Sequence, residues 1–142
     1  MSDLLTLLKI ILFSSVTMLN ETPFDLDQTP VAFTPDEPLD VLTPGAHLRI
    51  DVSDRIGKSP NVDRLEKIKR VFPEGCVVAV LQTPEGAELM FDRSWGSVSS
   101  DESALNLTSS SPLAEGTEFV HVTVSSCKLI RKTTVSWANS SS

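Results

Sequence analysis

The sequence predicts a mainly β protein: an antiparallel β-sandwich, Ig-like or jelly-roll-like, with one short helix, preceded by an N-terminal apolar helix. Between residues 38 and 138, short segments carry apolar, often β-branched residues at every second position, which is typical of half-buried strands. Only one stretch in this region has helical spacing, so helices do not alternate with strands as a parallel sheet requires. Residues 4–19 form a separate apolar run.

The chain is expected to divide into four parts. They are an N-terminal apolar helix over residues 1–20, a Pro-rich acidic linker over 21–45, the β-sandwich domain over 46–138 and a disordered tail over 139–142. A length of 142 residues suits one domain with an appendage. A sandwich of roughly 95 residues is large enough to fold independently.

The apolar run, LLTLLKIILFSSVTML, predicts a single-pass membrane anchor. Its sixteen residues fall slightly short of the about 17–25 that a spanning helix needs, and Lys9 can extend its stem toward the N-terminal interface. The sequence before Leu4 holds no basic residue, and no Ala-x-Ala follows the run, which argues against a cleaved secretion signal. A cleaved signal and a helix docked on a soluble partner are the alternatives.

The orientation of this anchor follows from the charges that come after it. No Lys or Arg occurs from residue 20 to residue 48, and positive residues prefer the cytoplasmic side of a membrane. We therefore expect a cytoplasmic N-terminus and a β domain in the periplasm or outside the cell. The positions expected to face the membrane or a partner helix are Leu4, Leu5, Leu8, Ile11, Leu12 and Phe13.

The predicted linker is rich in proline and in acidic residues. Residues 20–45 hold five of the nine prolines, and residues 21–45 carry six Asp or Glu and no Lys or Arg. Proline removes a backbone donor and disfavours helix in the residue before it, so an extended, semi-rigid segment is predicted. Phe24 and Phe33 are more apolar than a spacer needs, and we expect them to contact a surface of the domain or of a partner.

The strands of the domain follow from alternation and from turn residues. Leu48, Ile50 and Val52 alternate with polar residues, and a short strand at 39–42 precedes them across a Pro-Gly turn. A β-branched run, a Pro-Glu-Gly turn and a second apolar run predict a hairpin over 76–94. Further strands are predicted at 103–109, 118–126 and 128–139.

The one helix of the domain is predicted over residues 59–75, SPNVDRLEKIKRVFPEG. Apolar residues recur there at spacings of three and four. Asn61 or Ser59 can cap its start, basic residues fill its last turn, and Pro73 with Gly75 stops it.

The two cysteines, Cys76 and Cys127, lie beside predicted strands. A disulfide between them is permitted if the domain folds outside the cytoplasm, and it would close a loop of about 50 residues. The alternative is two separate buried thiols, which behave as small apolar side chains.

Composition and motifs exclude several functions. A formal charge of −7 argues against a nucleic-acid binder, which needs a basic surface. No serine lies in a Gly-x-Ser-x-Gly motif, and the one Gly-Lys-Ser lacks the glycine that a phosphate-binding loop needs at Val52. No cofactor and no metal are expected, because a dispersed metal site would need His47, His121 and Asp51 or Asp92 to meet in one pocket.

We therefore predict a non-catalytic, membrane-anchored accessory subunit whose β domain binds a partner membrane protein. Trp95, in a loop rich in glycine and serine, is a candidate binding anchor, with core packing as its alternative role. The other functions considered are an exported or soluble partner-binding or inhibitor domain, and an enzyme built on the dispersed metal site. Asn20, Asn106 and Asn139 also match the acceptor pattern of N-glycosylation.

Overall fold

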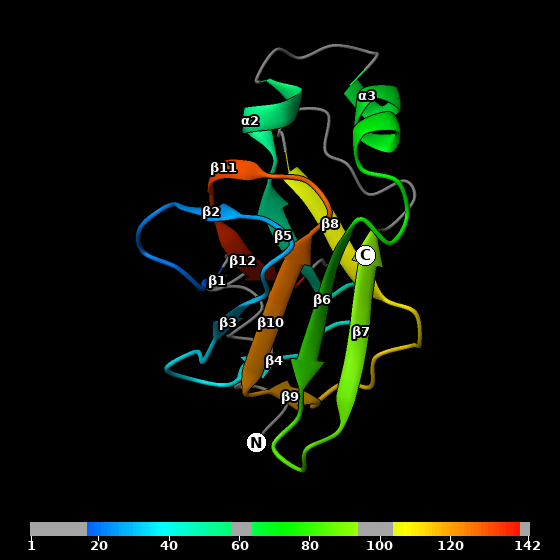
Figure 1. Ribbon diagram of the computed structural model, residues 1–142. Coiled ribbons are helices and arrows are strands. Elements are labelled where there is room, and N and C mark those ends of the chain that lie inside the picture. The colour runs from blue at the N-terminus through cyan, green and yellow to red at the C-terminus, as the bar shows by residue number, and fades with distance from the viewer. Residues whose placement is uncertain (1–16, 58–63, 94–103, 140–142) are drawn as a thin grey trace.

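The computed structural model describes residues 17–57, 64–93 and 104–139, which form a mostly β fold around one curled sheet (Figure 1). The eight strands of this sheet are β1 (Thr17–Met18), β3 (Val31–Phe33), β5 (His47–Asp51), β6 (Val77–Gln82), β7 (Glu88–Arg93), β8 (Ala104–Ser109), β10 (His121–Ser126) and β12 (Val135–Ala138). Two small sheets pair β2 (Phe24–Leu26) with β11 (Ile130–Thr133) and β4 (Leu39–Asp40) with β9 (Glu118–Phe119). The helices are α2 (Ser53–Ile56) and α3 (Arg64–Val71).

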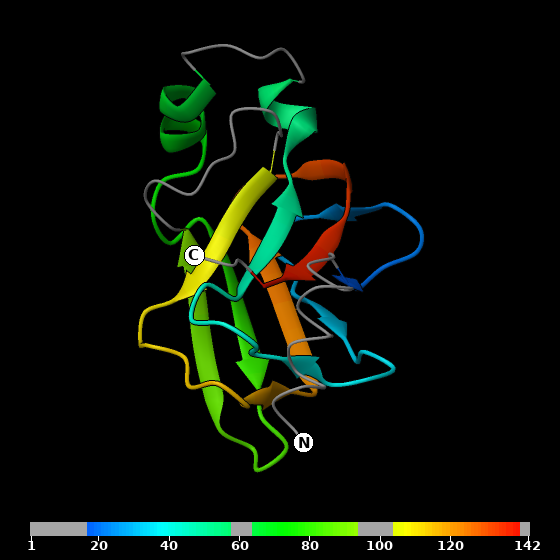
Figure 2. The ribbon, with the colours of Figure 1, turned by 180° about the vertical axis from the view of Figure 1, so that it is seen from behind.

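The curled sheet has the strand order β1-β12-β5-β8-β7-β6-β10-β3, and each neighbouring pair is antiparallel. Figures 1 and 2 show the sheet bending round on itself, so that β1 and β3 lie on the same side of the molecule. The predicted antiparallel, mainly β class is confirmed. The strands do not separate into the two facing sheets of a sandwich, because the β7–β8 pair keeps the ladder continuous.

The core lies inside the curl of the sheet. Strands β5, β6, β8 and β10 alternate buried and half-buried residues, so one face of each strand points inward. Three aromatic rings, those of Phe91, Phe119 and Trp137, meet there with centroids 5.7–6.1 Å apart. These rings come from β7, β9 and β12, so they join segments that are far apart in the sequence.

The predicted strands appear close to their expected positions. The hairpin expected over 76–94 consists of β6 and β7, and the segment 103–109 forms β8. The segment 118–126 divides into β9 and β10, and 128–139 divides into β11 and β12. The division at Val120 occurs where its amide donates to the Gln82 carbonyl at 2.8 Å.

The helix predicted over 59–75 is confirmed as α3, and its expected caps at 59 and 61 lie outside the described residues. Ile68 and Phe72 bury against the core at the C-terminal end of α3. Gly75 then turns the chain toward β6 with φ of 85°, a conformation that glycine adopts without strain.

The short helix α2 was not predicted. It begins directly after β5, where the side chain of Asp51 accepts a hydrogen bond from the Ser53 amide at 2.9 Å. Such a turn, made by an aspartate with the backbone two residues on, redirects the chain out of the strand. Figure 1 shows α2 and α3 together beyond one end of the curled sheet.

The segment predicted as a linker over 21–45 is part of the folded domain. It contains β2, β3 and β4, which pair with β11, β10 and β9. Leu26 and Leu39 from this segment are buried in the core. The prolines forbid a long helix, but they fall between these two- and three-residue strands, where no ladder amide is needed.

The described part of the N-terminal apolar run is also strand and not helix. Thr17 and Met18 form β1, which pairs with β12, so the predicted helix over 1–20 is wrong at these two residues. Residues 4–16, with the six expected membrane-facing side chains, lie outside the described residues. Within the three described ranges, no helix is long and apolar enough to cross a membrane.

The predicted tail over 139–142 is described only at its first residue. Asn139 is held by hydrogen bonds to the backbone of residues 40–43, so the prediction of disorder is wrong at this position. The cause is tertiary, because these partners come from a segment far away in the sequence.

Candidate functional site

The edge strand β1 and the β3–β4 connection, which follows the other edge strand of the curled sheet, border a groove of about 450 Å³, which we name the seam groove. The curl stops short of closure here, since β1 pairs with β12 and β3 with β10 but not with each other. The lining residues are Thr17–Leu19 and Glu21 on one side, Thr34–Asp40 and Leu42 on the other, and Trp137 and Asn139 from the end of the chain.

No strand in the described part of the chain pairs with the outer edge of β1, and this open edge faces the seam groove at Met18. In the antiparallel ladder with β12, Leu19 donates its amide to the Val135 carbonyl at 2.9 Å. Peptide groups alternate in direction along such a ladder, so those of Met18 point away from β12. The side chain of Met18 is 52% exposed, although it is large and apolar.

The facing edge, β3, is protected against pairing with another strand. It is three residues long, Pro30 precedes it directly, and Pro35 follows two residues after its end. Short edges flanked by proline resist pairing, because proline has no amide hydrogen to donate. β3 therefore offers little backbone for pairing with a further strand, whereas β1 has no such protection within the described residues.

The floor of the seam groove is apolar and held in place. Trp137 and Leu39 are each 2% exposed there. The indole Nε1 of Trp137 and the Nδ2 of Asn139 both donate to the Asp40 carbonyl, each at 3.0 Å. Asn139 also accepts a hydrogen bond from the Leu42 amide at 2.9 Å. These bonds fasten the β4 segment to the end of β12, so the groove is formed before any ligand arrives.

A second asparagine fastens β1 at the wall of the groove. The Oδ1 of Asn20 accepts a hydrogen bond from the Val135 amide at 2.7 Å, and its Nδ2 donates to the Thr22 carbonyl at 3.0 Å. Asn20 and Asn139 match the N-glycosylation pattern in the sequence, yet both side-chain amides bond to the backbone in the fold. These contacts point to a structural role for the two asparagines.

The rim of the seam groove is acidic. Glu21, Asp36 and Glu37 are exposed side chains along it, and the described residues that line the groove include no Lys or Arg. Charges of one sign that gather around a groove reinforce one another and attract ions of the opposite sign. The groove thus combines an apolar floor, an open strand edge and a negative rim.

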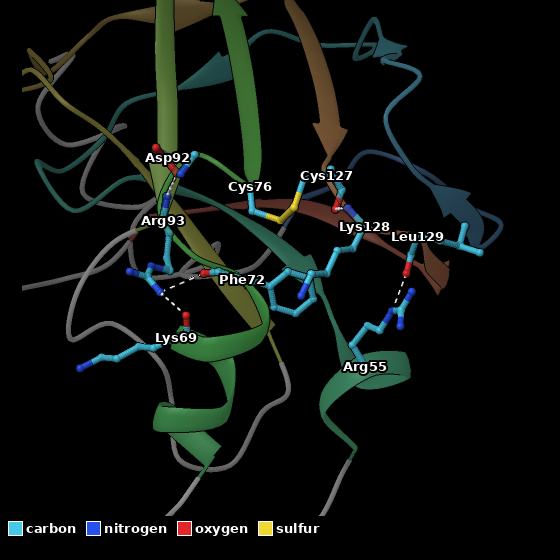
Figure 3. Close-up of a disulfide and its surroundings, with 11 residues drawn as sticks. Arg55, Lys69, Phe72, Cys76, Asp92, Arg93, Cys127, Lys128 and Leu129 are labelled. Atoms are coloured by element: carbon cyan, nitrogen blue, oxygen red, sulfur yellow. Dashed lines mark hydrogen bonds between the residues drawn. A yellow bond between two sulfur atoms is a disulfide. The ribbon is translucent and has the colours of Figure 1, made fainter.

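The predicted disulfide between Cys76 and Cys127 is confirmed (Figure 3). Cys76 comes directly before β6 and Cys127 directly after β10, and the pairing of Val77 with Ser126 brings these strand ends together. The two Cα atoms are 4.8 Å apart, and the Cys127 amide donates to the Cys76 carbonyl at 2.7 Å. The alternative of two separate buried thiols is therefore wrong.

Two arginines beside the disulfide fasten the helices to the sheet, as Figure 3 shows. Arg93 at the end of β7 donates from Nη1 to the Phe72 carbonyl at 2.9 Å, at the C-terminal end of α3. Cationic side chains at this end of a helix satisfy carbonyls that lack a partner within the helix. Arg55 of α2 donates from Nε to the Leu129 carbonyl at 2.7 Å. Both arginines therefore stabilise the fold, at the end of the molecule where the disulfide lies.

Phe24 and Phe33, the predicted contact residues, lie against each other. Their rings meet edge to face with centroids 5.5 Å apart, and both are half-buried against the core. The rings join β2 to β3 within the domain. A contact with a partner through these two side chains stays a prediction. The candidate anchor Trp95 lies outside the described residues.

The residues considered for a dispersed metal site do not gather into a cluster. Among the described residues, no group of three or more His, Cys, Asp or Glu side chains could hold a metal ion. The Nδ1 of His47 lies 2.8 Å from the Gly45 carbonyl, and that of His121 lies 3.2 Å from the hydroxyl of Thr34. The two histidines thus have separate local partners.

The sequence alone did not reveal the seam groove. Its acidic segment appears in the sequence as a stretch rich in Asp, Glu and Pro, which predicts a linker and not the wall of a groove. The floor residue Trp137 lies 97 positions from its partner Asp40, and no local pattern links them. No protein-family model, no curated protein and no solved structure matches the chain. Function must therefore be argued from the site itself.

Proposed function

We propose that this chain is a non-catalytic protein-binding module that works outside the cytoplasm, with its partner bound in the seam groove. The observation that carries the proposal is the incomplete closure of the sheet, which leaves the open edge of β1 beside a formed groove. Extended segments of partner proteins often bind at such an edge. Main-chain hydrogen bonds then supply affinity, and pockets for alternate side chains supply specificity.

The location outside the cytoplasm is supported by the disulfide between Cys76 and Cys127. Structural disulfides persist in oxidising compartments and are rare in the cytosol, where thiols are kept reduced. The apolar run at residues 4–19 supports the same location, since either a membrane anchor or a secretion signal would carry the domain across a membrane.

The membrane-anchored form of the proposal places the N-terminus in the cytoplasm and the β domain beside a partner membrane protein. The position of β1 weakens this form. Thr17 and Met18 pair with β12, so only residues 4–16 of the apolar run are left to cross the membrane. A spanning helix needs about 17–25 residues. This favours the second form, an exported module whose apolar segment is cleaved or docked on the partner.

Site-specific photocrosslinking in the native host tests the protein-binding role. A photoreactive amino acid replaces Met18 in the groove and, in a second variant, Glu37 on its rim. In the matched control it replaces Met90, which is 57% exposed on β7. We expect the same protein adduct from positions 18 and 37, and none from position 90. Equal adducts from all three positions, or none from the groove, would contradict the proposal.

The compartment and the anchor are tested on the chain taken from its host. Alkylation of the denatured, unreduced protein should leave both cysteines unmodified, whereas two modified thiols would place the protein in a reducing compartment. Intact mass then shows whether residues 4–16 are still present. Carbonate extraction of membranes separates an inserted anchor, which stays in the pellet, from a docked segment, which is released.

A further inference from the structure

The charges around the seam groove indicate which kind of segment fits it. We propose that the groove takes an extended segment of a partner protein that carries lysine or arginine side chains. Its backbone lies beside Met18 at the open edge of β1, and its cationic groups lie over Glu21, Asp36 and Glu37. This inference rests on the proposed function and adds to it the chemistry of the partner.

Acidic side chains stand on both sides of the seam groove. Glu21 follows β1 closely, whereas Asp36 and Glu37 belong to the β3–β4 connection on the opposite side. A segment that runs between them along β1 passes within reach of negative charge on either side. Exposed opposite charges at such a rim add modest affinity each, and together they favour a cationic partner and speed its approach.

The apolar floor suits the same kind of segment. Successive side chains of an extended chain point in opposite directions, so one set faces Trp137 and Leu39 while the other faces the rim. Apolar side chains fit against Trp137 and Leu39. The aliphatic stems of lysine and arginine fit there too, because their charged groups can reach outward to water and to the rim. An alternation of apolar and cationic residues therefore matches the groove best.

Within the described ranges, the Lys and Arg side chains whose burial is described are not among the residues that line the seam groove. Figure 1 shows α2, α3 and β11 in the upper half of the molecule, while β9 and the β3–β4 connection lie in the lower half. With the exception of Arg49 on β5, these Lys and Arg belong to the upper group, in or beside these elements: Arg55, Lys67, Lys69, Arg70, Arg93, Lys128, Arg131 and Lys132. Among the described residues, no Lys or Arg lines the groove to neutralise this rim, so its negative charge is open to a cationic partner.

The negative surface continues beyond the groove. The pairing of Asp40 with Glu118 places β9 next to the groove floor. Glu118 in turn lines a second hollow together with Glu85 and Glu115, and the described lining of that hollow also has no Lys or Arg. The negative electrostatic field around the groove and β9 therefore attracts a cationic segment over a wider area than the charges of the rim alone would.

An NMR titration of the full chain tests the inference. The probe is a five-residue capped peptide of alternating lysine and leucine, and the comparison peptide has glutamate in place of lysine. We expect the lysine peptide to shift the ε-methyl signal of Met18 and the indole signal of Trp137. Met90 supplies an internal control, since its methyl group is equally exposed but lies on β7, away from the groove. We expect the glutamate peptide to shift neither Met18 nor Trp137.

Charge reversal at the rim is the second measurement. The double variant D36K/E37K should raise the Kd of the lysine peptide about tenfold, because two weak attractions become repulsions. The matched control E66K/E74K makes the same change of net charge in and beside α3, at the other end of the molecule, and should leave the Kd within about twofold of the original. All four side chains are exposed, so both variants are expected to fold.

Three results would overturn the inference. The first is a Met18 signal that does not change at millimolar lysine peptide. This result would mean that the groove is empty or is already filled by a second copy of the protein or by another segment of the same chain. The second is an equal shift of Met18 and Met90. The third is an equal loss of affinity in the two double variants, which would assign the effect to net charge alone. If position 18 crosslinks to a partner but the lysine peptide does not bind, this inference is wrong and the proposed function still holds.

Discussion

The indole nitrogen of Trp137 and the backbone carbonyl of Asp40 lie 3.0 Å apart and form a hydrogen bond across 97 positions of the sequence. The bond joins the last strand, β12, to the acidic segment near the beginning of the domain. Asn139 donates to the same carbonyl, so one oxygen anchors two side chains. The floor of the seam groove depends on this junction.

Replacing Trp137 separates the contribution of its hydrogen bond from that of its ring. Trp137→Phe keeps an aromatic ring against Phe91 and Phe119, and the Asp40 carbonyl keeps its bond from Asn139. We expect a loss of about 1–2 kcal/mol in the free energy of unfolding for Trp137→Phe. Trp137→Ala should cost about 3–5 kcal/mol. Urea unfolding measures both, and equal losses would show that the junction holds by the hydrogen bond alone.

Removal of the disulfide should destabilise the fold without changing its strand order. For a sequence separation of 51, the chain-entropy model gives about 4 kcal/mol for the double variant Cys76→Ala/Cys127→Ala. Denaturant unfolding with and without a reductant measures the effect. The reductant should lower the free energy of unfolding of the unchanged protein to that of the variant, and it should leave the value for the variant unchanged. A variant as stable as the oxidised protein would contradict this expectation.

A buried hydroxyl beside β5 is a further stabilising contact. Thr133 is fully buried, and its Oγ1 donates to the Asp51 carbonyl at 2.6 Å. Thr133→Val keeps the shape but removes the donor, so the variant should lose about 1–2 kcal/mol. The control is Thr123→Val on the half-buried outer face of β10, where we expect a change within about 0.5 kcal/mol. Equal losses at the two positions would show that the Thr-to-Val change itself, and not the lost hydrogen bond of Thr133, lowers the stability.

The edge-to-face pair of Phe24 and Phe33 predicts an energetic coupling between β2 and β3. A double-mutant cycle to leucine should give an interaction energy of about 0.5–1.5 kcal/mol between the two rings. Thermal or urea unfolding of the unchanged protein, the two single variants and the double variant supplies the four values. Additive losses would show that the two rings act independently, and would leave them available as separate contacts for a partner.

Local pattern predicted those parts of the fold that local physics controls. Alternation located the inward-facing residues of β5 and β10, because side chains of a strand alternate between two faces. The stop signals Pro73 and Gly75 fitted the end of α3. The prolines of 21–45 excluded helix correctly, but they do not exclude strands of two or three residues that bond between the prolines.

The candidate site was not predictable in the same way. The pairing of β1 with β12 joins segments separated by almost the whole chain, and it turns the end of an apolar run into a sheet edge. The acidic residues of the rim were noticed as composition, but their position opposite Glu21 depends on how far the sheet curls. Sequence pattern carries no information on that curl.

By itself, the sequence determined the strand-rich class, the short helix α3, the acidic character of one segment and the two cysteines that could pair. Each of these depends on neighbouring residues or on composition. The tertiary structure decided the rest: the closeness of Cys76 to Cys127, the pairing of the acidic segment with the domain, and the gap between β1 and β3. These features follow from contacts between distant segments, whose free energy depends on the packing of the whole sheet and not on any local spacing.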